Sequence, residues 1–121
     1  MIGIGRYYAP DGTEIDQKEW ARLIEERDNA KGPESWWRKR TVINHQVLDD
    51  EGHVYLPHVE VSTVWVGINH QFSDDAAPLF WETMIFGGQH DQDCWRYATR
   101  EEAFDHHEEV VRALRDGEEP T

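Results

Sequence analysis

The fold of this chain is decided by a central stretch that reads Val59-Glu-Val-Ser-Thr-Val-Trp-Val-Gly-Ile-Asn69. β-Branched and aromatic residues dominate this stretch, which is typical of a strand. A second apolar run extends from Phe80 to Phe86 and ends at Gly87-Gly88. The two runs are separated by a short polar segment, residues 70–78, which favours their antiparallel pairing.

Further strands are predicted on both sides of this central pair. Pro10-Asp11-Gly12 has the residues of a tight turn and predicts a small hairpin over residues 4–15. Residues 36–48 are rich in β-formers, and residues 54–56 begin a return that Pro57 interrupts. Residues 94–98 form a last short strand in this interpretation.

Two helices are predicted from their capping residues. Asp16 followed by Glu19 is a variant of the capping box, and Thr99 followed by Glu102 is a second capping box. After Asp16, apolar residues recur at helical spacing. After Thr99, one face collects Ala103, Phe104, His107, Val110, Val111 and Leu114.

These elements predict an α+β fold: an antiparallel β-meander of about four strands, with two helices on one face and a short N-terminal β-hairpin. The length of 121 residues favours a single domain. We assign that domain to residues 1–116 and expect residues 117–121 to form an acidic, frayed tail.

Both faces of the central pair of strands are apolar. Because side chains alternate in a strand, the odd positions place Val61, Trp65, Trp81 and Ile85 on one side, and the even positions are also largely apolar. Two helices can cover only one face, so we hypothesise that these four residues contribute to a protein interface. The alternative is that the N-terminal hairpin and loops bury them.

The charge of the chain limits its partners. It has 25 acidic and 12 basic residues, a net charge of −13. Phosphate backbones and anionic membrane surfaces repel such a chain, so neither direct nucleic-acid binding nor membrane binding is expected. Cys94 is the only cysteine, which fits a reducing compartment. No signal-peptide h-region or apolar run of about 20 residues is present. We therefore expect a cytoplasmic protein.

One pair of residues is a candidate for acid–base chemistry. Glu82 lies in the middle of an apolar strand, where desolvation disfavours the ionised carboxylate. His70 ends the paired strand and is its candidate catalytic partner. The alternative is a structural Glu82 that is hydrogen-bonded or lies at a sheet edge.

No metal or cofactor is expected from the sequence. The histidines match no standard zinc spacing, and Cys94 has no CxxC partner. His107 falls on the apolar side of its helix and is interpreted as a core histidine with satisfied hydrogen bonds. The segment Trp36-Trp37-Arg38-Lys39-Arg40 is similar in composition to single-strand binders, but we interpret it as a strand entry with packed tryptophans.

Four stretches, in this order, resemble a group of small uncharacterised proteins of actinobacterial phages and prophages. They are Gly5-Arg-Tyr-Tyr-Ala-Pro-Asp-Gly-Thr-Glu-Ile15, Val59-Glu-Val-Ser-Thr-Val-Trp-Val-Gly-Ile-Asn-His70, Pro78-Leu-Phe-Trp-Glu-Thr-Met-Ile-Phe-Gly-Gly88 and Trp95-Arg-Tyr-Ala-Thr-Arg-Glu-Glu-Ala103. The resemblance implies a phage accessory protein that acts in the host cytoplasm, and it implies no catalytic residue.

Three functions remain open at this point. The first is a non-enzymatic accessory protein that binds another protein or a second copy of itself. The second is a small enzyme that uses Glu82 as general acid or base. The third is an acidic inhibitor that mimics DNA, because the chain has a large excess of acidic residues.

Overall fold

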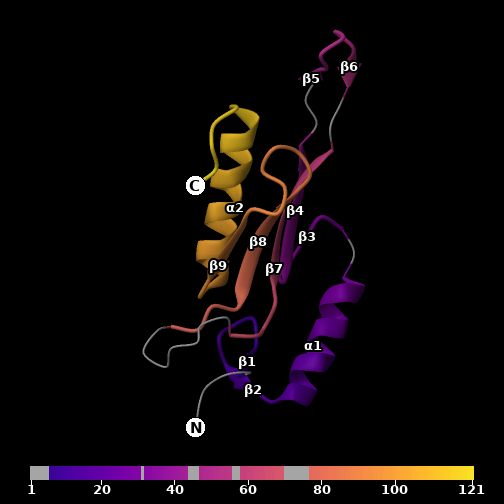
Figure 1. Cartoon of the computed structure of the whole chain (residues 1–121). Helices are drawn as coiled ribbons and strands as arrows, with labels where there is room; N and C mark the ends of the chain where they lie inside the picture. Colours follow the sequence, from indigo (N-terminus) through magenta and orange to yellow (C-terminus); the bar gives the residue numbers. More distant parts are fainter. Residues whose placement is uncertain (1–5, 31, 44–46, 56–57, 70–76) are drawn as a thin grey trace.

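The computed structural model describes residues 6–30, 32–43, 47–55, 58–69 and 77–121. The chain forms two helices and a set of short strands, most of which lie between the two helices in the sequence (Figure 1). In order, they are β1 (Tyr7–Tyr8), β2 (Glu14–Ile15), α1 (Gln17–Asn29), β3 (Glu34–Ser35), β4 (Arg38–Ile43), β5 (Val47–Leu48), β6 (Val54–Tyr55), β7 (Val59–Trp65), β8 (Trp81–Phe86), β9 (Cys94–Tyr97) and α2 (Arg100–Arg115).

The main sheet has five strands in the order β3-β4-β7-β8-β9, and all neighbours are antiparallel. The register between the two central strands pairs Thr63 with Thr83 and Trp65 with Trp81. β5 and β6 form a separate hairpin that projects beyond the sheet from the β4–β7 connection (Figure 1). The predicted α+β meander is therefore confirmed, with β3 as an additional edge strand.

Both predicted helix caps are present. The Asp16 side chain accepts a hydrogen bond from the Glu19 N–H at 2.8 Å, and the Thr99 hydroxyl accepts one from the Glu102 N–H at 3.1 Å. Each bond satisfies a backbone donor that the first turn of a helix leaves unpaired.

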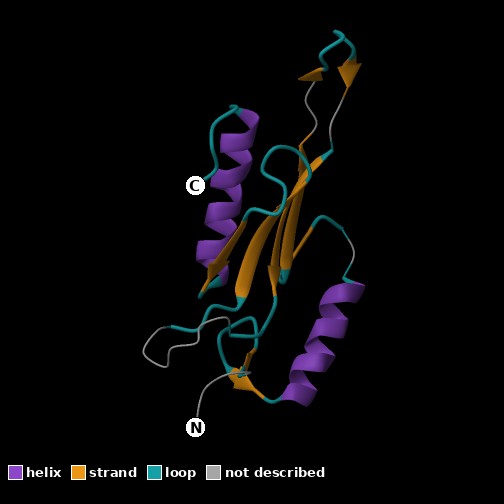
Figure 2. Cartoon of the chain, viewed as in Figure 1, coloured by secondary structure: helices purple, strands orange, loops and turns teal. Residues whose placement is uncertain are grey.

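The two helices differ from the prediction in where they pack. α2 lies along one face of the sheet, whereas α1 lies beyond the end of the strands, next to the β1–β2 hairpin (Figure 2). α1 is held there by hydrogen bonds to the end of β7: Trp20 Nε1 donates to the Val66 carbonyl at 3.0 Å and Arg27 Nη1 to the Trp65 carbonyl at 2.8 Å. α2 therefore covers most of one face, and the N-terminal hairpin and α1 pack against Trp65 and Trp81 at the end of the same face.

The strand predicted to run to Asn69 ends at Trp65. The chain turns at Gly67, whose φ is +72°, a conformation that favours glycine. Beyond the turn, the Tyr8 N–H donates to the Gly67 carbonyl at 2.8 Å, and Ile68 forms a bridge with Tyr7. These contacts attach the N-terminal hairpin to the end of the sheet.

Residues 117–121, which were predicted to fray, fold back along α2. The Glu118 N–H donates to the Ala113 carbonyl at 2.8 Å, and His106 Nε2 donates to the Thr121 carbonyl at 2.7 Å. Within the described part of the chain, neither helix has the length and apolar character that a membrane crossing requires.

Candidate functional site

The four residues predicted to form an interface are buried inside the chain. Val61, Trp65, Trp81 and Ile85 each have 0% of their surface exposed. Val61 and Ile85 pack against Val110 and Val111 of α2 in one core cluster. A side chain with no exposed surface cannot contact a partner of the folded chain, so the interface prediction is wrong for these four residues.

The opposite face of the sheet is left open by the elements that the structure describes. No described helix or other strand packs over it, and two of its apolar residues remain well exposed, Val42 at 37% and Phe86 at 45%. We call this surface the open face. Its residues on β4, β7, β8 and β9 are Arg38, Arg40, Val42, Glu60, Ser62, Val64, Glu82, Met84, Phe86, Cys94 and Arg96.

The open face also contains ion pairs between residues of neighbouring strands. Arg40 Nε lies 2.7 Å from a Glu60 carboxylate oxygen, and Arg96 Nε lies 3.2 Å from a Glu82 carboxylate oxygen. Both glutamates are largely shielded, with 18% of their side-chain surface exposed. Their charges are thus compensated within the face.

Glu82 belongs to the open face and is not among the residues that line the pocket described below. Its carboxylate pairs with Arg96 on β9, which is the structural alternative considered above. Ser62 shares its face, but the hydroxyls of Thr63 and Thr83 lie on the opposite, buried face. His70 lies outside the described residues. The structure places two ionisable groups beside Glu82, namely Arg96 and the Cys94 thiol, whose pKa is raised by burial and by the Glu82 charge.

A hydrogen-bonded polar group lies under α2 in the core. The buried ring of His107 contacts the Thr63 hydroxyl through Nδ1 at 2.8 Å and the Thr41 hydroxyl through Nε2 at 2.9 Å. The hydroxyls of Thr63 and Thr83 are 2.6 Å apart. Burial lowers the pKa of His107 to about 4, so the ring is neutral near pH 7. The prediction of a satisfied core histidine is confirmed.

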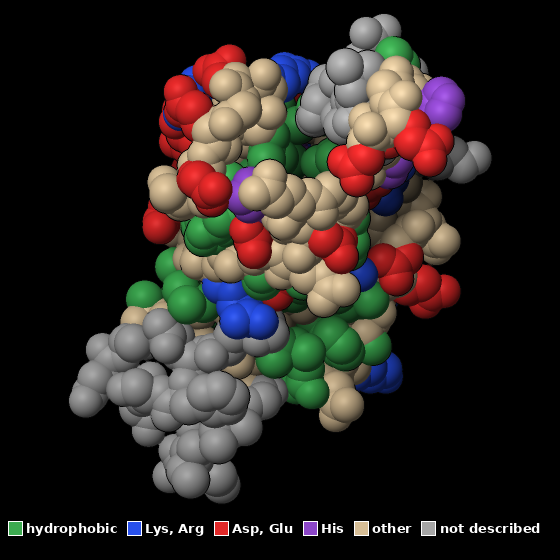
Figure 3. Space-filling model, turned by 45° about the horizontal axis from the view of Figure 1, so that its top comes forward, with side chains coloured by type: hydrophobic (Ala, Val, Ile, Leu, Met, Phe, Trp, Pro, Cys, Tyr) green, Lys and Arg blue, Asp and Glu red, His purple; other side chains and the backbone are tan. Residues whose placement is uncertain are grey.

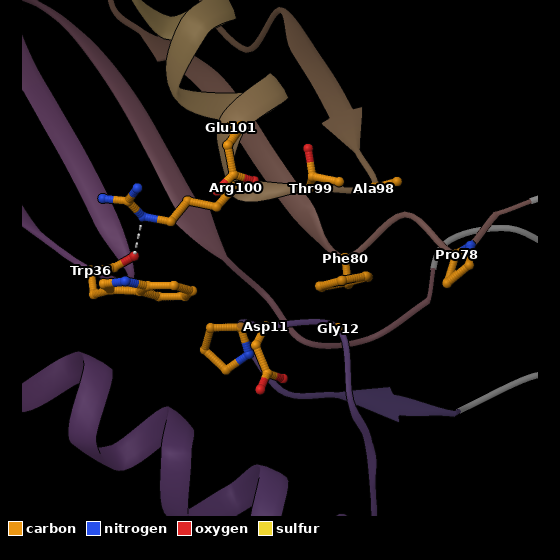
Figure 4. A pocket seen from close by; sticks show the side chains of 10 residues that line it. Asp11, Gly12, Trp36, Pro78, Phe80, Ala98, Thr99, Arg100 and Glu101 are labelled. Atoms are coloured by element: carbon orange, nitrogen blue, oxygen red, sulfur yellow. Dashed lines mark hydrogen bonds between the residues drawn. The ribbon is translucent and has the colours of Figure 1, made fainter.

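A pocket of about 420 Å³ lies at the other end of α2. Trp36 and Phe80 present their rings to it, the start of α2 lies on one side, and the turn at Asp11 and Gly12 lies opposite (Figure 4). Trp36 is 48% exposed, and Phe80 is nearly buried and stacked on Tyr8 with ring centroids 5.3 Å apart. The pocket is thus walled by aromatic rings that other rings hold in place.

Arg100 forms part of the pocket wall. Its Nε donates to the Trp36 carbonyl at 3.1 Å, and its guanidinium carbon lies 5.0 Å from the Trp36 ring centroid and 4.2 Å from that of Phe104. The guanidinium is thus stacked on aromatic rings, while the carboxylates of Asp11 and Glu101 make no ion pair within the described residues. The sequence analysis missed this pocket because its wall comes from separate segments with no shared motif.

The basic segment near Trp36 is largely used within the fold. Lys39 pairs with Glu108 of α2, Arg40 pairs with Glu60, and Arg38 donates to backbone carbonyls at the end of α1. The interpretation of this segment as a strand entry is confirmed by β4, but its tryptophans are not both packed, since Trp36 is 48% exposed. Among the described residues, no group of three or more histidine, cysteine or acidic side chains is arranged to hold a metal ion.

Comparisons with known proteins assign no relative to this chain. No family model, curated protein or solved structure matches it.

Proposed function

We propose that this chain is a protein-binding module whose contact surface is the open face. The observation that carries the proposal is the exposure of Val42 and Phe86 on a sheet face that no described element covers. These two residues flank Glu60 in one cross-strand row, so their apolar surfaces lie at the same end of the sheet. Exposed apolar surface of this kind favours contact with another protein.

The charge distribution supports the same surface. The open face carries three basic residues, Arg38, Arg40 and Arg96, and only two acidic residues, Glu60 and Glu82, although the whole chain has 25 acids and 12 bases. In the view of Figure 3, acidic side chains are spread across the upper half of the molecule. A partner that docks on the open face therefore avoids most of the acidic surface. The partner in this proposal is another protein with an apolar contact surface.

The biological setting belongs to the same proposal. The resemblance to actinobacterial phage and prophage proteins supports an accessory role during infection or lysogeny. The lone cysteine supports action in the reducing cytoplasm of the host. In this setting the chain acts by occupying a surface of a host or phage protein, and direct contact with nucleic acid or membrane plays no part because of its negative charge.

Capture from an actinobacterial lysate by the immobilised chain tests the proposal. Three forms are compared: wild type, Val42→Lys/Phe86→Lys, and Val54→Lys as the control. Val54 is also an exposed apolar residue, at 57%, but lies on the projecting β5–β6 hairpin. Circular dichroism and thermal melting establish that each form is folded.

The expected result is a protein retained by the wild type and by Val54→Lys but lost with Val42→Lys/Phe86→Lys. Equal retention by all three forms would show that the open face is not the contact surface. Sedimentation of the three forms identifies a second copy as the partner if only the open-face variant is monomeric. A wild-type chain that captures nothing and sediments as a monomer would overturn the proposal.

A further inference from the structure

We propose that the pocket between Trp36, Phe80 and the start of α2 binds a proline-containing peptide segment that carries a lysine or arginine. This site is separate from the open face and its argument does not depend on the proposed function. The proposal rests on the shape of the pocket wall and on the charges at its rim.

The wall of the pocket fits apolar rings. Trp36, Phe80, Pro10 and Pro78 line it, together with Ala98 and Gly12. Aromatic-lined grooves recognise proline-rich segments because such segments are already extended and lose little entropy when they bind. A volume of about 420 Å³ accommodates one or two side chains of such a segment.

The wall is also preorganised. The Trp36 ring packs against Trp81 with centroids 6.1 Å apart, and Arg100 lies against the Trp36 ring. On the other side, Phe80 is stacked on Tyr8. Rings held in this way need little reordering when a ligand arrives, which favours binding.

The rim charges select a basic segment. Glu101 extends from α2 toward the pocket, whereas Asp11 lies on the opposite side with its carboxylate directed away from Glu101 and accepting from the Thr13 N–H (Figure 4). Hydrogen bonds from Thr13 lower the pKa of Asp11, so its carboxylate is ionised. The one cation of the wall, Arg100, is engaged by the Trp36 carbonyl and by two aromatic rings. A lysine or arginine next to the proline can therefore meet the Glu101 carboxylate, whereas an anionic ligand meets its repulsion.

Three synthetic ten-residue peptides test the inference by isothermal titration at low salt. One combines prolines with arginines, one combines prolines with glutamates, and one combines glycine and serine with the same arginines. We expect the proline–arginine peptide to bind at least tenfold more tightly than the other two. In two-dimensional NMR spectra, the Trp36 indole N–H signal should shift on binding.

If the glycine–serine–arginine peptide bound as tightly as the proline–arginine peptide, the association would be purely electrostatic and the proposal would be overturned. Tighter binding of the proline–glutamate peptide would show that Arg100 is an anion receptor and would also overturn the proposal. No binding of any peptide would do the same.

Variants locate the site. Asp11→Asn keeps the side-chain oxygen that accepts from the Thr13 N–H, so the turn is preserved while the charge is removed. We expect Asp11→Asn/Glu101→Gln to weaken the proline–arginine peptide by at least fivefold. Glu25→Gln removes a charge from the exposed surface of α1, away from the pocket, and should leave the affinity unchanged. Phe86→Lys should also leave it unchanged, which separates this site from the open face.

Discussion

Nδ1 of His107 lies 2.8 Å from the hydroxyl of Thr63, and both side chains have no exposed surface. The histidine comes from α2 and the threonine from the middle of β7, so this contact joins the helix to the sheet through polar atoms. A buried polar group is tolerated only when its hydrogen bonds are made, and here both ring nitrogens have hydroxyl partners. The contact makes the stability of the fold depend on pH.

Acid should destabilise the chain through His107. Its pKa in the folded state is about 4, below the ordinary value of 6.5, so the unfolded state takes up the proton more readily. Stability attributable to this residue is therefore full above pH 6.5, falls as the pH drops from 6.5 to 4, and is constant below that range. The total loss is about 3 kcal/mol in the free energy of unfolding.

Urea titrations at a series of pH values measure this loss. Carboxylates also contribute to acid denaturation, so the matched control is His107→Gln, which keeps hydrogen-bonding atoms but does not titrate in this range. The difference between the two proteins should shrink as the pH falls from 6.5 to 4. Parallel pH profiles would contradict a neutral, buried His107.

The hydroxyl of Thr63 should contribute more to the free energy of unfolding than that of a typical threonine. It contacts two groups, the Thr83 hydroxyl at 2.6 Å and His107. Thr63→Val keeps the shape of the side chain but leaves both partners short of a hydrogen bond. We expect a loss of about 1–3 kcal/mol in the free energy of unfolding.

A double-mutant cycle with Thr83→Val checks whether the two hydroxyls act together. Thr63→Val/Thr83→Val should cost less than the sum of the single variants, because the second substitution removes a partner that the first has already left unsatisfied. Strict additivity would show that the two hydroxyls do not interact.

Much of the fold can be predicted from the sequence because its signals are local. The caps at Asp16 and Thr99 mark both helix starts, and β-formers mark the strands from Val59 and Trp81. β3 could not be predicted, since the two residues that follow Gly32 and Pro33 carry no strand pattern and pair only because β4 is adjacent. The end of β7 depends on a turn at Gly67, which the run of β-formers conceals.

The covered face of the sheet was harder to identify because both alternating sets of residues contain large apolar side chains. The polar residues of the two central strands indicate which face is covered. On the two central strands, Glu60 and Glu82 fall on the same side as Phe86, whereas the only polar side chains on the opposite side are the hydroxyls of Thr63 and Thr83. A helix can cover threonines by hydrogen bonding to them, but covering two glutamates requires desolvating charge. The site missed entirely, at Trp36 and Arg100, depends on long-range packing that no single segment encodes.

The N-cap of α1 provides a direct test of a sequence signal. Asp16→Ala removes the acceptor of the Glu19 N–H and should lower the free energy of unfolding by about 1 kcal/mol. Asp16→Asn retains the acceptor oxygen and removes the charge, so it should lose only a few tenths of that amount by weakening the interaction with the helix dipole. Equal losses for the two variants, measured by thermal and urea unfolding, would indicate that the charge matters and the hydrogen bond does not.

Gly67 should tolerate substitution poorly, for steric as well as backbone reasons. Its φ is +72°, and a Cβ atom at this position would lie 2.6 Å from Cζ2 of Trp65 and 2.7 Å from Cδ1 of Trp20. Neither ring can yield easily. The Trp65 Nε1 donates to the Tyr8 carbonyl at 2.9 Å and the Trp20 Nε1 to the Val66 carbonyl at 3.0 Å, so each displacement breaks a hydrogen bond.

Gly117 supplies the matched control, since its φ of +73° is almost the same and a Cβ atom there has no neighbour within 4 Å. Gly117→Ala should therefore report the backbone strain alone, about 1 kcal/mol in the free energy of unfolding. Gly67→Ala should cost about 2 kcal/mol more, because it adds overpacking against the two indoles. If both variants unfold at the same urea concentration, the close approach of Trp20 and Trp65 to Gly67 is relieved at no cost, and the attachment of α1 to the end of β7 is looser than these contacts imply.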